Sequence, residues 1–139
     1  MNLELLKEAL ENDSNINIIN ETLGTIKSKK NDVLQQFGFT KQEIKEYHNK
    51  LKNYLYVDSI NELKIGHSIR YFNITDPNNI NLSVNAIIND IKILDKGIAI
   101  VIKFFNNKYS TIYYNNNIIF KKLSNQENVL LAALKYLNK

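Results

Sequence analysis

The chain has 139 residues, of which 44% are hydrophobic, and this is enough for one domain of ordinary size with its own core. It contains no cysteine, which excludes disulfides and thiolate metal sites, and it shows neither an 18-residue apolar run nor a basic N-terminal secretion signal. From these features we expect an intracellular globular protein that is not secreted and has no membrane segment. Its formal net charge is +4 at pH 7.

The first part of the chain, residues 1–57, is predicted to be a helical hairpin region. A short helix places Leu3, Leu6 and Leu10 at helical spacing, and it could pack on the hairpin or stand apart. The next helix lies in the run "INIINETLGTIKSKKNDVLQQFGF", where apolar residues recur every three or four positions. This spacing is typical of one amphipathic face or of a coiled-coil seam. The residues on that face are Ile19, Leu23, Ile26, Val33 and Phe37, with Lys30 interrupting the pattern.

The second helix of the hairpin has a clear start. Gly38 ends the preceding helix, because glycine adopts positive φ without steric cost. Thr40 and Glu43 then have the spacing of a capping box, and Phe39 and Ile44 that of a hydrophobic staple. We expect this helix to run to about residue 56 and to fold back on the first.

The second part, residues 63–139, is predicted to be a small β-barrel with a C-terminal helix. Turn signals occur at Asp95-Lys96-Gly97 and at Asn106-Asn107. The apolar residues change parity between Ile88 and Ile91, which predicts a bulge or a sharp bend. The fold class is therefore α+β, with a five-stranded antiparallel SH3-like barrel. The expected strands are 65–74, 82–94, 98–105, 109–114 and 118–122.

The end of the sequence is predicted to be helical. Ser124 and Glu127 repeat the capping-box spacing, and the apolar run "VLLAALKYL" follows them. This helix must bury its apolar face. We expect it to lie either on the open end of the barrel or against the N-terminal hairpin.

Three stretches of the sequence resemble a family of uncharacterised proteins of large nucleocytoplasmic DNA viruses. They are "YHNKLKNYLYVDSINELKIGHSIRYF", "LSVNAIINDIKILDKGIAIVIKFF" and "IIFKKLSNQENVLLAALKYL", within residues 47–137. The resemblance implies a viral protein of unassigned role, in the host cytoplasm or in the virus particle, and it transfers no catalytic residue. The amino-acid composition agrees with such a viral genome, because 23 Asn, 20 Ile and 17 Lys indicate an A/T-rich genome.

No combination of residues predicts catalysis. His48 and His67 have no spacing typical of a metal site or of a nucleophile with its base. The four glycines are scattered, so no phosphate loop exists, and Asp90 and Asp95 fit turns. We expect no metal, no cofactor and no enzymatic activity.

The positive charge is concentrated in the predicted barrel. Residues 92–122 contain six lysines and one acid, with several tyrosines between them. Lysines that neutralise phosphates beside aromatic rings that stack on bases are typical of small single-strand-binding domains. This hypothesis predicts a DNA- or RNA-binding face of low sequence specificity. Its residues are Arg70, Lys92, Lys103, Lys108, Tyr109, Tyr113 and Lys121.

A second hypothesis is favoured, that of a non-enzymatic interaction or structural accessory protein. Tyrosine is a common strand residue, lysine protects exposed strand edges, and the coding bias inflates lysine. The apolar seam of the helical region could instead bind a protein partner or a second copy of the chain. Whether the lysines gather on one face with two tyrosines distinguishes the two hypotheses. The seam residues are Ile19, Leu23, Ile26, Lys30 and Val33.

Overall fold

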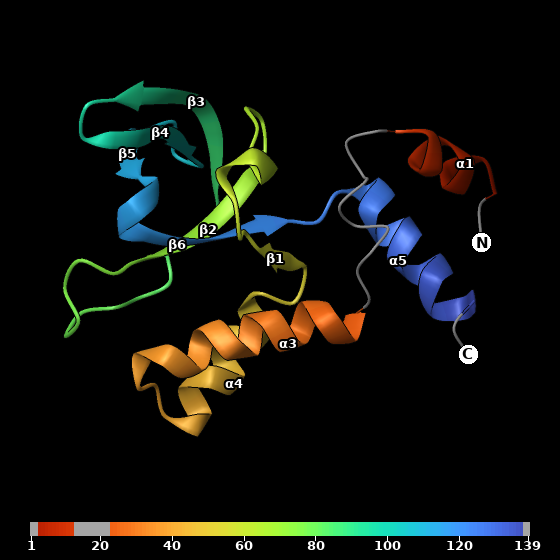
Figure 1. Cartoon of the computed structure of the whole chain (residues 1–139), viewed down its shortest axis with the longest axis horizontal. Helices are drawn as coiled ribbons and strands as arrows, with labels where there is room; N and C mark the ends of the chain where they lie inside the picture. Colours follow the sequence, from red (N-terminus) through yellow and green to blue (C-terminus); the bar gives the residue numbers. More distant parts are fainter. Residues whose placement is uncertain (1–2, 13–22, 138–139) are drawn as a thin grey trace.

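The computed structural model of the protein describes residues 3–12 and 23–137 and shows an α+β fold built on one antiparallel sheet (Figure 1). Six strands lie in the order β1-β6-β2-β3-β4-β5. The last strand of the chain therefore lies in the interior of the sheet, between β1 and β2. The strands are β1 (Tyr54–Tyr56), β2 (Ser68–Asn73), β3 (Ala86–Leu94), β4 (Gly97–Phe104), β5 (Tyr109–Tyr113) and β6 (Asn117–Lys122).

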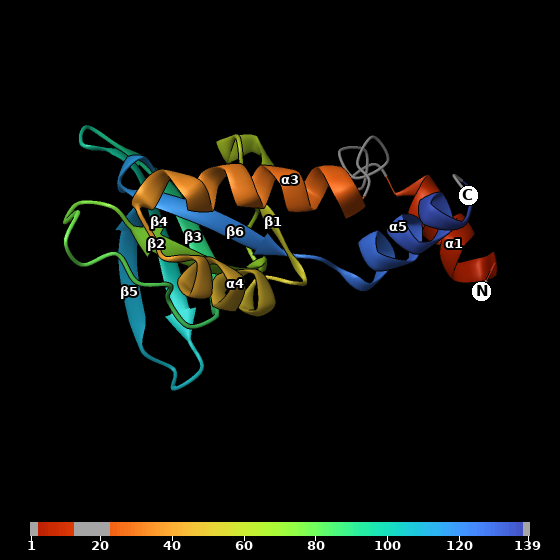
Figure 2. The same cartoon turned by 90° about the horizontal axis from the view of Figure 1, so that it is seen from below.

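Helices occupy two places around this sheet (Figures 1 and 2). Helices α3 and α4 form the predicted hairpin and pack against β1, β2 and β6. Helices α1 and α5 lie side by side beyond the end of β6. Their bounds are α1 (Leu3–Glu11), α3 (Leu23–Leu34), α4 (Lys41–Lys50) and α5 (Asn125–Leu137), with 3-10 helices η2 (Gln35–Phe37), η3 (Ile60–Glu62) and η4 (Tyr114–Asn116).

The expected closed barrel of five strands is wrong. The sheet has six strands and is open, because β1 and β5 form its two edges and do not pair in the described part of the chain. The additional strand comes from Tyr54–Tyr56, which the sequence placed at the end of a helix. Helix α4 instead ends at Lys50, and β1 pairs with β6 through Tyr54↔Lys122 and Tyr56↔Phe120. A long-range pairing thus overrides the helical spacing of the apolar residues.

The parity change in β3 is confirmed as a bulge. The register with β4 shifts between Ile88 and Asp90, so the residues on either side of the shift alternate out of phase. Bulges increase the local twist and bend a strand. Two of the predicted turn residues have positive φ, Gly97 with 127° and Asn107 with 63°. Residues other than Gly and Asn rarely adopt positive φ.

Two cores lie on opposite faces of the sheet. One is aliphatic and is formed by β2, β3, β4, β5 and β6, with Ile69, Ile100 and Ile119 almost completely buried. The other is aromatic and joins the hairpin to the sheet. Its centre is Phe72, which is fully buried and whose ring centroid lies 5.1 Å from that of Tyr47 and 5.9 Å from that of Phe120.

The hairpin therefore docks on the sheet through shared buried side chains. Its helix α4 begins with the predicted capping box, in which Thr40 Oγ1 accepts from Glu43 N at 3.1 Å and Glu43 Oε1 accepts from Thr40 N at 2.9 Å. Gly38, with φ 71°, separates α4 from the preceding 3-10 helix η2. The division into regions 1–57 and 63–139 stays a prediction.

The α1–α5 pair has a small core of its own. Ala9 of α1 packs with Leu130 and Leu131 of α5, and Ile26 of α3 joins them. The C-terminal helix thus packs on α1, and its capping box is confirmed because Glu127 N donates to Ser124 Oγ at 3.1 Å. Leu3 and Leu10, predicted on the apolar face of α1, are largely exposed. Within the described ranges, no helix is long and apolar enough to cross a membrane.

Candidate functional site

The outer face of strands β3 to β5 gathers most of the residues predicted to bind nucleic acid. Residues directly opposite one another in paired strands project from the same face of a sheet. The register pairs Lys103 with Tyr109, and Ala99 with both Lys92 and Tyr113. Two lysines and two tyrosines therefore share a face. We call this face the outer β face, defined by Ile87, Asp90, Lys92, Ala99, Val101, Lys103, Tyr109, Thr111 and Tyr113.

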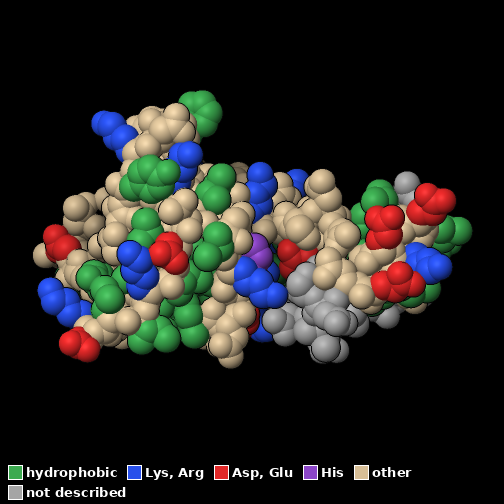
Figure 3. Space-filling model, turned by 90° about the horizontal axis from the view of Figure 1, so that it is seen from above, with side chains coloured by type: hydrophobic (Ala, Val, Ile, Leu, Met, Phe, Trp, Pro, Cys, Tyr) green, Lys and Arg blue, Asp and Glu red, His purple; other side chains and the backbone are tan. Residues whose placement is uncertain are grey.

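The strongest cationic and aromatic character lies at the β4–β5 turn. The Lys103 ammonium lies over the Tyr109 ring, 5.8 Å from its centroid, and Tyr109 is 58% exposed. Phe105 in the turn is fully exposed, and Lys108 beside it is exposed as well. In Figure 3, hydrophobic and basic side chains gather on the projection at the upper left, where this hairpin extends from the sheet. The turn thus presents two aromatic rings and two ammonium groups to solvent.

The other end of the outer β face is less basic. The Lys92 ammonium lies 3.9 Å from the Asp90 carboxylate, and both side chains are exposed. Exposed ion pairs of this kind contribute little to stability, but they reduce the net charge that a phosphate would meet. Tyr113 is half-buried on this side. We therefore place the centre of the candidate site at Lys103 and Tyr109.

Two predicted members of the basic face have structural partners elsewhere. Arg70 Nε donates to Ser83 O at 3.0 Å, and an Arg70 terminal nitrogen donates to Lys50 O at 3.2 Å. Lys121 is largely buried, and its ammonium lies 3.6 Å from the Glu127 carboxylate. The structure does not bring these two residues to the outer β face. Both connect the sheet to neighbouring segments.

The predicted partner-binding seam is largely occupied inside the protein. Ile26, Lys30 and Val33 are between 4% and 6% exposed. Ile26 packs in the α1–α5 core and Val33 in the aromatic core, so neither presents a free surface. Leu23 is the first residue of α3, and Ile19 lies outside the described residues.

Two residues of the outer surface were not among those predicted from the sequence. Ile87 is 46% exposed on the outer β face, and Phe105 is fully exposed at the hairpin turn. A signal for Phe105 exists, because adjacent residues at the end of a strand point to opposite sides. If Phe104 packs inward, Phe105 must point outward.

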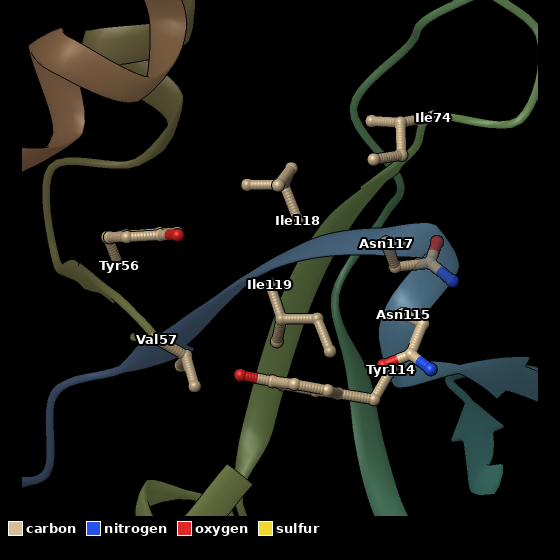
Figure 4. A pocket seen from close by; sticks show the side chains of 8 residues that line it. All are labelled: Tyr56, Val57, Ile74, Tyr114, Asn115, Asn117, Ile118 and Ile119. Carbon is tan, nitrogen blue, oxygen red and sulfur yellow. The ribbon is translucent and has the colours of Figure 1, made fainter. Parts of the chain in front are cut away.

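A hollow of about 210 Å³ lies beside the start of β6 (Figure 4). The rings of Tyr56 and Tyr114 flank Ile118 and Ile119 there, and the Tyr114 hydroxyl donates to Asp58 O at 3.3 Å. Burial, followed by nearby acids, raises the pKa of Tyr56, and burial is also the main cause that raises the pKa of Tyr114. Both hydroxyls therefore stay protonated at neutral pH. The hollow offers hydrogen-bonding groups without charge.

The two histidines lie apart and have separate partners. His67 Nδ1 accepts from Lys64 N at 3.1 Å, and His48 Nε2 lies 3.1 Å from Asn31 Oδ1. Burial is the first cause that lowers the pKa of each imidazole, and nearby lysines lower it further. Among the residues that the structure describes, no group of three His, Cys, Asp or Glu side chains could hold a metal ion.

The chain has no significant match among protein-family models, curated proteins or solved structures. The resemblance to proteins of large DNA viruses, the expected lack of enzymatic activity and the cellular location stay predictions.

Proposed function

We propose that the protein binds single-stranded nucleic acid through the outer β face, without strong sequence specificity. The observation that carries the proposal is the register of β4 and β5, which sets Lys103 beside an exposed Tyr109. The adjoining turn adds Phe105 and Lys108. A binding surface of this kind needs no catalytic residue and no cofactor.

The chemistry of the face fits an unpaired strand better than a duplex. Ammonium groups neutralise phosphates, while exposed rings stack on bases, each stack contributing roughly 1–3 kcal/mol. The Lys103–Tyr109 contact holds the charge close to the ring, so one nucleotide could meet both groups. The single arginine of the chain, Arg70, is bonded to backbone carbonyls, which leaves no guanidinium for paired contacts to a base edge.

The proposal is tested with a double variant, Lys103→Gln/Tyr109→Ala, and a matched control, Lys135→Gln/Tyr136→Ala, which makes the same changes on exposed residues of α5. Binding of a labelled 20-nucleotide strand is followed by fluorescence anisotropy at about 50 and about 200 mM salt. We expect the site variant to weaken binding roughly 10- to 100-fold and the control to match the wild type. Equal binding by both variants, or no binding by the wild type at the lower salt, would reject the proposal.

A second candidate function is protein interaction, and it is favoured by exposed apolar side chains before β3, near the end of β3 and just after β4. Val84 is 64% exposed, Ile93 88% and Phe105 fully. In this reading the partner is a second copy of the chain, and a role as a viral accessory protein rests on the resemblance alone. Sedimentation equilibrium at increasing concentration tests it: Ile93→Asn/Phe105→Ser should reduce association, and a monomeric wild type would exclude it.

We also propose an SH3-like connectivity for strands β2 to β6. Strands β2 to β5 form an up-and-down meander, after which the 3-10 helix η4 leads into β6, and β6 returns to pair with β2. An experimental structure would test this assignment.

A further inference from the structure

A cationic pocket lies between α3 and α4, away from the outer β face. Its volume is about 350 Å³, and it borders the α3–α4 hairpin that Figure 1 shows below the sheet. The polar residues that line it are Lys27 and Lys30 from α3, His48 and Asn49 from α4, and Lys52 just after α4. Every ionisable side chain in the lining is basic.

One residue of the pocket lining is a buried lysine. Lys30 is only 4% exposed, and its Nζ donates one hydrogen bond, to Leu51 O at 2.8 Å. An ammonium group has three N–H donors. Buried charges are normally paired with an opposite charge, yet no carboxylate in the described part of the chain pairs with Lys30. The Lys30 amine is thus buried without an anionic partner among the described residues.

The surrounding residues add to this positive charge. Burial is the main cause that lowers the pKa of Lys30, and Lys27 lowers it further. Burial likewise lowers the pKa of His48, followed by Lys30 and Lys27. Both groups therefore lie close to other basic side chains. An anion in the pocket would offset this positive charge.

We propose that this pocket binds a phosphate group. A phosphate carries up to two negative charges and accepts several hydrogen bonds, and lysine is a common phosphate ligand. Lys30 would supply its free N–H donors, Lys27 and Lys52 the charge at the rim, and Asn49 a further amide donor. A purely structural role for Lys30, in which it only joins α3 to the end of α4, predicts that the two lysines at the rim have no effect on phosphate binding.

The inference does not depend on the proposed nucleic-acid function, because the two surfaces share no residue. The phosphate could be free, part of a small phosphorylated molecule, or part of a nucleic-acid backbone. All three offer the same chemistry to the pocket. The probes of the experiment therefore separate these sources.

The test uses calorimetric titration of the full chain with inorganic phosphate at constant ionic strength. The site variant is Lys27→Gln/Lys52→Gln, which leaves the buried Lys30 and its bond intact. The control is Lys41→Gln/Lys96→Gln, which removes the same charge at exposed positions outside the pocket lining. We expect the site variant to bind phosphate at least about tenfold more weakly than the wild type, and the control to bind within about twofold.

Three further probes identify the source of the phosphate. AMP, adenosine and an oligonucleotide without a terminal phosphate are titrated into the same three proteins. If the wild type binds AMP but not adenosine, and the site variant no longer binds AMP, the result supports recognition of a small phosphorylated molecule. If the wild type binds the oligonucleotide alone, and the site variant no longer binds it, the result supports a backbone phosphate. No binding of any phosphate-bearing probe by the wild type, or equal binding by site variant and control, overturns the proposal.

Discussion

Phe72 is the residue whose replacement should reveal most about how the helical hairpin is held. It is fully buried on β2, and its ring lies within 6 Å, centroid to centroid, of those of Phe37, Phe39, Tyr47 and Phe120. Three of these four rings belong to the hairpin. Replacing Phe72 with alanine removes the side chain that connects them to the sheet.

The expected loss follows from the burial of this side chain. Truncation of a buried Phe to Ala typically costs about 3–5 kcal/mol, because the lost transfer free energy adds to the cost of a cavity. Native domains are stable by only about 5–15 kcal/mol. Phe72→Ala should therefore remove a large fraction of the free energy of unfolding. Phe105→Ala makes the same chemical change at a fully exposed site and should alter stability by less than about 0.5 kcal/mol.

Urea denaturation followed by far-ultraviolet circular dichroism measures both variants. We expect the midpoint to fall strongly for Phe72→Ala and to stay unchanged for Phe105→Ala, with a similar m-value. Should Phe72→Ala not fold, Phe72→Leu provides a milder version of the same test. A loss for Phe72→Ala as small as that for Phe105→Ala would refute the argument, because the aromatic core would then contribute little to stability.

Three further changes test other parts of the structure. Thr40→Ala should lower the free energy of unfolding by about 1 kcal/mol, because α4 loses its capping box. The control Thr111→Ala, at an exposed strand position, should change the free energy of unfolding less, and chemical denaturation measures both variants. Gly97→Ala should cost about 1–3 kcal/mol, because φ 127° is strained for alanine, and an unchanged melting temperature would contradict this; Lys96→Ala is the control. Because the pKa of His67 is lowered in the folded state, first by burial, its contribution to stability is present above the unfolded pKa near 6.5 and is lost as the pH falls below it. Melting temperatures from pH 7.5 to 5 should therefore decline less for His67→Asn than for the wild type, and parallel curves would show that His67 has no such role.

The local chemistry of the chain could be predicted from sequence. Thr40 and Ser124 start the helices that their capping boxes indicate, and Asn107 and Gly97 make the expected turns. The bulge in β3 appears where the apolar parity changes. Each of these features depends on residues close together in the chain, so a short stretch of sequence contains the information.

Features decided by distant segments could not be predicted. Tyr54 continues the helical spacing of Ile44 and Leu51. Tyr54–Tyr56 nevertheless form a strand, because they pair with β6, which lies far along the chain. The same limit applies to the candidate site. The composition of residues 92–122 was sufficient to group Lys103 with Tyr109. The ion pair of Lys121 with Glu127, by contrast, involves a helix that packs beyond the sheet.

The pairing of α1 with α5 has a consequence during synthesis. Asn12, just after α1, donates a side-chain hydrogen bond to Gln126 of α5 at 2.7 Å, across a sequence separation of 114 residues. At about 5–20 residues per second, α1 is synthesised roughly 6–23 s before its partner. A helix of nine residues is marginal in isolation. During that interval the apolar side of α1 is exposed to other nascent chains and to chaperones, and the completion of α5 ends this exposure.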